Sequence, residues 1–119
     1  MNNIDKIIEL LRSGVKISNA LKEVYDNPKI YIPFNDEDFD ISLEELNLSM
    51  RSCNALRRSN FNTLNDVINH FAEKGWNSIK NFGKTSATEV FEKIINVAWN
   101  KMNKFQKAEF LMNIEETFE

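Results

Sequence analysis

Two short runs of sequence, separated by one helical segment, constrain this chain more than any other feature. The first run places Arg51 and Asn54 three positions apart, on one face of a helix. The second is a turn with a single glycine, Gly83, followed by a helix that we expect to begin at Ser86. A helix start leaves backbone N–H groups without intrahelical acceptors, and such groups bind anions. A cation, an amide and a helix start on two helices that can pack together suit a phosphate backbone better than a small substrate.

The rest of the chain shows helical periodicity with clear start and stop signals. Ser49 is expected to cap the helix that carries Arg51, and Asn60 to end it in a left-handed conformation. Pro28 and Pro33 favour an extended segment between them. Apolar spacing predicts helices within residues 4–11, 18–24, 42–45, 50–59, 63–74, 86–102 and 105–118. The last of these would carry its apolar face on Phe105, Ala108, Leu111, Met112 and Phe118. The predicted fold class is therefore all-α.

Composition changes along the chain predict three parts. Residues 1–40 form an N-terminal helical extension that ends in an acidic linker, residues 41–100 form the central domain, and residues 101–119 form a C-terminal helix. The first helix, with Ile4, Ile7 and Leu11 on one face, could pack on the domain, bind a partner helix or pair with its own copy. Packing on the domain is the default interpretation.

Composition also excludes several classes of protein. A hydrophobic content of 42%, with nine Phe and two Trp, is enough for a core. No stretch is long enough to span a membrane and no signal-peptide pattern is present, so a cytoplasmic protein is expected. The single cysteine, Cys53, cannot form an internal disulfide, and no Cys/His set predicts a metal site or a cofactor. No acid–base pair or nucleophile constellation predicts an enzyme.

The charge distribution limits how strongly the chain can bind a polyanion. The net charge is −3, yet residues 41–100 carry +1, so any contact with nucleic acid is local and modest. A guanidinium such as that of Arg51 fits the narrow, negative minor groove of A-tracts, and Asn54 can hydrogen-bond groove edges or the backbone. The N–H groups of Lys84 to Ser86 would donate to a phosphate. Alone, an exposed Arg is usually only solvated, and a Gly such as Gly83 usually only connects two elements.

Residues 42–95 resemble the C-terminal domain of the bacterial RNA polymerase alpha subunit. That family carries L-[ED]-L-[ST]-V-R-S-x-N-C-L-K on one helix, which here reads LNLSMRSCNALR over residues 46–57. Its turn and following helix carry N-[LF]-G-[RK]-K-S-L-x-E-[IV], which here reads NFGKTSATEV over residues 81–90. The intervening NTLNDV, residues 62–67, matches the start of the family's middle helix.

The resemblance implies a compact helical domain with a helix–hairpin–helix-like element that binds A+T-rich DNA in the minor groove. Carried over by position, Arg51 is the groove arginine and Asn54 its polar neighbour. Gly83 and Ser86 form the phosphate-contacting turn, and Glu89 stands beside the groove arginine. The function this implies is that of a DNA-binding, transcription-associated protein of a bacterium or phage.

The sequence departs from the family pattern at positions that favour a second interpretation. Thr85 stands where the family has a second Lys, and Asn47 replaces an acid of the patch that meets sigma factor, while Glu45 is kept. The alternative is a protein-interaction module that imitates the polymerase domain and binds a transcription factor, sigma or a polymerase component. Glu44 and Glu45 are then the candidate protein contacts. The oligomeric state is left open.

Overall fold

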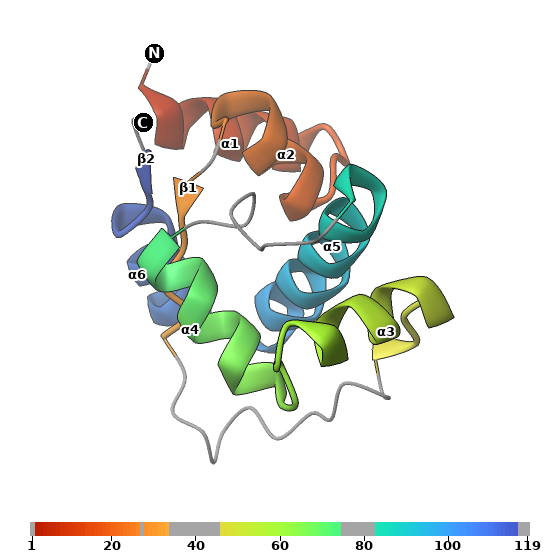
Figure 1. Cartoon of the computed structure of the whole chain (residues 1–119). Helices are drawn as coiled ribbons and strands as arrows, with labels where there is room; N and C mark the ends of the chain where they lie inside the picture. Colours follow the sequence, from red (N-terminus) through yellow and green to blue (C-terminus); the bar gives the residue numbers. More distant parts are fainter. Residues whose placement is uncertain (1, 27, 34–45, 75–82, 117–119) are drawn as a thin grey trace.

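A computed structural model of the chain describes residues 2–26, 28–33, 46–74 and 83–116. Six helices dominate these ranges, and Figure 1 shows them around a shared centre. Their bounds, with those of two short strands, are α1 Asn3–Arg12, α2 Ile17–Val24, β1 Pro28–Lys29, α3 Met50–Arg58, α4 Leu64–Lys74, α5 Lys84–Lys101, α6 Lys104–Met112 and β2 Glu115–Glu116. The predicted all-α class is confirmed.

The long helix α5 is the centre of the hydrophobic core, and both α2 and α3 pack against it (Figure 1). Its buried side chains recur at helical spacing, as a helix covered on several sides requires. They are Ala87, Val90, Phe91, Ile94, Ile95 and Ala98. Leu56 of α3, Val67 of α4 and Phe110 of α6 are fully buried in the same core.

The N-terminal helices belong to this core as well. Ile7 of α1 and Leu21 of α2 are fully buried in the cluster that contains Phe91, so the expectation that the first helix packs on the rest of the chain is confirmed. The division of the chain at residues 40 and 100 stays a prediction.

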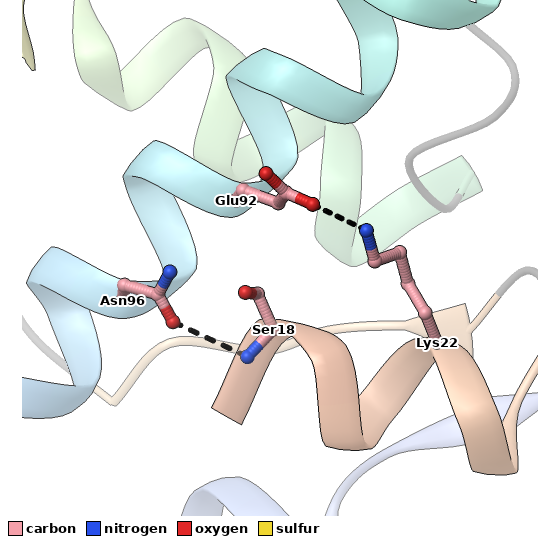
Figure 2. Close-up of polar contacts among 4 residues, drawn as sticks. All are labelled: Ser18, Lys22, Glu92 and Asn96. Atoms are coloured by element: carbon pink, nitrogen blue, oxygen red, sulfur yellow. Dashed lines mark hydrogen bonds and ion pairs between the residues drawn. The ribbon is translucent and has the colours of Figure 1, made fainter. Parts of the chain in front are cut away.

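Two polar contacts hold α2 on α5 (Figure 2). The Asn96 side-chain oxygen accepts a hydrogen bond from the backbone N–H of Ser18, at 3.2 Å. One helical turn away, the ammonium group of Lys22 forms an ion pair with the carboxylate of Glu92. Because an N–H in the first turn of a helix has no intrahelical acceptor, Asn96 closes the start of α2 from another helix.

The two strands are a small addition to the helical fold. Pro28 pairs with Glu116 and Lys29 with Glu115, in antiparallel register. The segment that follows β1 contains the buried side chains of Ile30 and Ile32, and the structure assigns it neither helix nor strand. The extended segment expected between the two prolines is confirmed at Pro28–Lys29, which form β1, and the pairing of this strand with the C-terminal segment was not predicted.

Local signals gave correct ends for several elements. Ser49 is the N-cap of α3, and its hydroxyl oxygen accepts from the backbone N–H of Ser52 at 3.2 Å. Asn60 has φ +65°, the left-handed conformation expected after this helix. Gly14 ends the first helical stretch with φ +91°, where an L side chain would be strained.

Two expectations about the helices were wrong. The helix α5 begins at Lys84, two residues before the expected Ser86, because Gly83 is its N-cap and Ser86 is already inside the first turn. The C-terminal helix ends at Met112 and does not continue to Phe118, because the following chain pairs with β1. The helix predicted over residues 42–45, the connection at residues 76–82 and Phe118 itself lie outside the described residues.

The apolar face expected for the last helix was wrong at Phe105, Ala108 and Met112, which are exposed, and right at Leu111, which is buried. Phe105 is 88% exposed and Met112 is 74% exposed, while Phe110 is fully buried and Leu111 nearly so. The helix has apolar residues on both of its sides, so periodicity alone could not indicate which side faces the core.

Candidate nucleic-acid interface

The first turn of α3 is fixed by hydrogen bonds to its own residues and to α5. Beyond the Ser49 cap, a full capping box would need a long acidic or amide side chain at Ser52, the third helical residue. Ser52 is a buried serine, and the missing partner comes from α5. The Glu89 carboxylate accepts a hydrogen bond from the backbone N–H of Ser49, at 2.5 Å. This contact holds the start of α3 against the second turn of α5.

The outer face of α3 is polar and basic. Arg51, Asn54 and Arg58 are exposed, while Leu56 is buried on the opposite side. These three polar residues follow the i, i+3, i+7 spacing of one helix face, so the predicted grouping of Arg51 with Asn54 is confirmed in geometry. Arg57 is exposed as well, and Met50 beside Arg51 is 80% exposed. The surface therefore has local positive charge in a protein whose net charge is negative.

No side chain of the described residues caps the start of α5. Gly83 is the N-cap with φ −68° and ψ 155°, an extended conformation that any residue adopts, and it makes no side-chain cap hydrogen bond. A Cβ atom added there would meet nothing within 4 Å. Intrahelical bonding begins with the N–H of Ala87, which donates to the Gly83 carbonyl at 3.0 Å. The three preceding N–H groups, of Lys84 to Ser86, belong to the first turn and have no intrahelical acceptor.

Within the described ranges, the other helices have a side chain that accepts from an N–H group at their start. Asn2 serves α1, Asn96 serves α2, Ser49 serves α3, Thr63 serves α4 and Asn103 serves α6. Only α5 begins without such an acceptor among these residues. The helix start predicted to face a phosphate is thus the one that the described side chains leave unoccupied.

The remaining candidate residues have different surroundings. Ser86 lies in the first turn of α5 and is only 4% exposed as a whole residue. Lys84 is the first residue of α5, and Thr85 beside it is exposed. Glu89 is half-buried and bonded to Ser49, so it positions α3. Glu44 and Glu45 lie outside the described residues.

Sequence reasoning missed the contact between Glu89 and Ser49. The two residues are 40 positions apart, and neither has a local signal that indicates the other. Only an indirect signal was available. Ser49 is a typical N-cap, but Ser52 stands at the third helical position where a capping box has Glu or Gln, so the Ser49 N–H needs an acceptor from elsewhere.

These helices and this surface define a small all-α domain with a basic helix beside an open helix start. The family model for the C-terminal domain of the bacterial RNA polymerase alpha chain matches residues 33–96. The chain belongs to this family. Members of the family in general bind upstream promoter DNA and transcription factors and are not catalytic, which confirms the expectation that the chain is not an enzyme.

Full-length alpha subunits are similar to the chain over this region. The DNA-directed RNA polymerase subunit alpha of Thalassiosira pseudonana is 45% identical over 91 residues, covering 76% of this chain and 28% of that protein. The subunit of Thermosynechococcus vestitus is 43% identical over 80 residues, covering 66% and 25%. That of Tropheryma whipplei strain Twist is 44% identical over 63 residues, covering 53% and 19%. The chain thus spans less than a third of the length of these relatives, and no solved structure matches it.

Among the described residues, no helix combines the length and the apolar character needed to cross a membrane.

Proposed function

We propose that this chain binds A+T-rich double-stranded DNA in the minor groove and acts in transcription. Arg51 inserts its guanidinium into the groove, Asn54 hydrogen-bonds the groove edge or the sugar-phosphate backbone, and the N–H groups of Lys84 to Ser86 hold a phosphate. Gly83 itself contributes no side chain in front of these N–H groups. Glu89 is a positioning residue that acts through Ser49.

The observation that carries this proposal is the hydrogen bond from the Ser49 N–H to Glu89. It ties the first turn of α3, which bears Arg51, to the helix whose start is open. Glu89 lies six residues after Gly83, which is about 9 Å along the axis of α5. A bound duplex could therefore meet the guanidinium and the open helix start at the same time.

The proposal is tested by titrating the protein with an A+T-rich duplex and following backbone amides by NMR. We expect shifts around Arg51 and Gly83, binding that weakens with salt, and weaker binding to a G+C-rich duplex of equal length. Arg51→Ala should lower the affinity roughly tenfold to hundredfold, as loss of a specific groove contact does. If the A+T-rich duplex moves no amide near Arg51 or Gly83, the proposal fails.

Arg12→Ala is the matched control for this titration. Arg12 is an exposed arginine in the last turn of α1, so its removal changes the net charge equally. In Figure 1, α1 and α3 lie on different sides of the molecule. We expect Arg12→Ala to retain nearly all of the affinity, and an equal loss in both variants would indicate only non-specific charge attraction.

A second candidate function is a protein-interaction module that binds sigma, a transcription factor or a polymerase component. The net charge of −3 and the exposed Thr85, at a position where the resemblance predicts Lys, favour it. A pull-down from a host lysate tests this candidate. Recovery of sigma or polymerase subunits supports it, and recovery of neither counts against it.

A further inference from the structure

One large apolar side chain interrupts the polar outer face of α3. Met50, the first residue of this helix, is 80% exposed. Single exposed apolar residues are common on protein surfaces, so the exposure of Met50 alone indicates nothing. Its position is what distinguishes it, because the next residue along the chain is Arg51.

Helix geometry places Met50 on the face that carries the candidate DNA-binding residues. At 100° per residue, Met50 and Asn54 lie about 40° apart around the axis of α3, and Arg51 lies about 60° beyond Asn54. All three side chains are exposed. A ligand surface that covers both Arg51 and Asn54 therefore also covers Met50.

The start of α3 is held in place from two sides. The Ser49 hydroxyl accepts from the Ser52 N–H, and the Ser49 N–H donates to the Glu89 carboxylate of α5. Met50 directly follows Ser49, so both contacts hold its backbone. Binding then has to order the side chain of Met50 but not its backbone, which keeps the entropy cost of a contact small.

The minor groove of A+T-rich DNA offers an apolar side chain one kind of partner. At A·T pairs the floor of the groove carries only hydrogen-bond acceptors, and a thioether has no donor for them. The walls of the groove are deoxyribose rings, whose carbon atoms are apolar. Proteins that bind the minor groove combine polar side chains that read it with apolar side chains such as Met. Insertion between base pairs would have to unstack them, whereas contact with a wall leaves the stack intact.

We propose that Met50 packs its thioether on a deoxyribose wall of the minor groove beside Arg51, an inference that rests on the DNA-binding function proposed above. This contact adds affinity that depends little on salt, because it neutralises no phosphate and releases no counterion. The family pattern has Val at this position, and a Val side chain ends at its Cγ atoms. The reach of the Sδ and Cε atoms of Met50 is therefore this chain's own.

Fluorescence anisotropy with an A+T-rich duplex over a series of salt concentrations tests the proposal. Met50→Gln keeps the side-chain length and the helix propensity but replaces apolar atoms with an amide. It should lower the affinity about threefold to tenfold and leave the slope of log affinity against log salt concentration unchanged. Met50→Leu keeps the apolar surface and should retain most of the affinity. Arg51→Ala, by contrast, should make the slope shallower by about 0.9.

Met112→Gln is the matched control, because it makes the same substitution at a methionine of α6 that is 74% exposed. In Figure 1, α6 and α3 lie on different sides of the molecule, so this variant should change neither the affinity nor the slope. Isotope labelling of the methionine methyl groups gives a direct measurement by NMR. In the complex we expect nuclear Overhauser effects between the Met50 methyl group and sugar protons of the duplex.

The outcomes separate this proposal from the one on which it rests. If the wild-type protein binds the duplex and Met50→Gln binds it equally well, the contact is absent while DNA binding stands. The proposal is likewise overturned if Met50→Leu loses as much affinity as Met50→Gln, or if the Met50 methyl group contacts no sugar proton. If Met50→Gln instead reduces only the recovery of sigma or polymerase subunits from a lysate, Met50 belongs to a protein interface and the proposal is wrong. If the wild-type protein does not bind the duplex, both proposals fail.

Discussion

The starts of α3 and α5 belong to the same candidate surface and are built in opposite ways. At α3, the Ser49 hydroxyl accepts from the Ser52 N–H and the Glu89 carboxylate accepts from the Ser49 N–H. At α5, Gly83 makes no side-chain cap hydrogen bond. Caps of this kind each contribute about 0.5–2 kcal/mol, so the open start leaves α5 without a common source of stability.

This difference separates the structural part of the surface from the part proposed to bind. The closed start fixes the direction in which α3 presents Arg51. The open start keeps backbone N–H groups and the positive end of the helix dipole available to an anion. Adding a cap to α5 should therefore change mainly the affinity for DNA, whereas removing a cap from α3 should change mainly the stability of the fold.

The largest effect is expected when the open start is closed by a negative charge. Gly83→Asp fits the site, since its Cβ meets nothing within 4 Å and the N-cap conformation is already extended. The new carboxylate should accept from the Ser86 N–H, which raises the free energy of unfolding by a few tenths of a kcal/mol. It also repels a phosphate, so the affinity for A+T-rich DNA should fall roughly tenfold to hundredfold. Urea unfolding and fluorescence anisotropy measure the two effects.

Gly83→Ser is the control for that substitution. Serine caps the helix without adding charge. We expect a similar gain in stability with a much smaller loss of DNA affinity. Equal affinities for Gly83→Asp and wild type would show that no phosphate binds at this helix start.

A smaller effect is expected when the contact that Glu89 of α5 makes with the start of α3 is removed. Glu89→Ala leaves the Ser49 N–H without its carboxylate acceptor and releases α3 from α5. The free energy of unfolding should fall by about 1–2 kcal/mol, as for an unmade hydrogen bond to a charged group that is partly exposed. Glu89→Gln keeps an acceptor oxygen and should lose less. A Glu89→Ala protein as stable as Glu89→Gln would mean that the hydrogen bond contributes nothing.

Removing the local cap of α3 should have a still smaller effect. Ser49→Ala deletes the acceptor for the Ser52 N–H and should lower the free energy of unfolding by about 0.5–1 kcal/mol. Because Ser49 and Glu89 serve the same turn, the double variant Ser49→Ala/Glu89→Ala should lose less than the sum of the two single losses. Urea unfolding of the four proteins measures the coupling, and strict additivity would show that the two contacts act independently.

The sequence contained the signals for the local part of this surface. Ser49 at a cap position and Asn60 after the helix are short-range signals, because each acts on backbone groups within a few residues. Arg51 and Asn54 could be placed on one face for the same reason, since helical spacing alone decides it. The start of α5 was missed by two residues because Ser86 has the side chain of a typical N-cap, while Gly83 occupies that position.

The long-range part could not be predicted from one sequence. Glu89 reaches Ser49 across 40 residues and Asn96 reaches Ser18 across 78, and no periodicity relates such pairs. The orientation of α6 was missed because Phe105 and Phe110 offer apolar residues on both sides of one helix. Which side is buried depends on packing against Trp99, a tertiary contact.

The start of α4 differs from both, because its capping hydrogen bonds come from neighbouring residues of the same segment. The smallest effect on stability is expected here. The Asp66 carboxylate accepts from the backbone N–H groups of Asn62, at 3.0 Å, and Thr63, at 3.1 Å. The Asn62 N–H, followed by the Thr63 N–H, lowers the pKa of Asp66 from its usual 3.8 in the folded protein. A carboxyl whose pKa is lower in the folded state stabilises the fold above its unfolded pKa and loses this contribution as the pH falls through the folded value.

We therefore expect the start of α4 to weaken in acid, below pH 3.8. Asp66→Asn keeps an acceptor oxygen and removes the titrating charge, so it should be less stable than wild type near neutral pH. The difference between the two proteins should shrink as the pH falls below 3.8 and vanish at lower pH. Urea unfolding of both proteins across this range measures it, and a difference that persists unchanged in acid would mean that the Asp66 charge does not close this helix start.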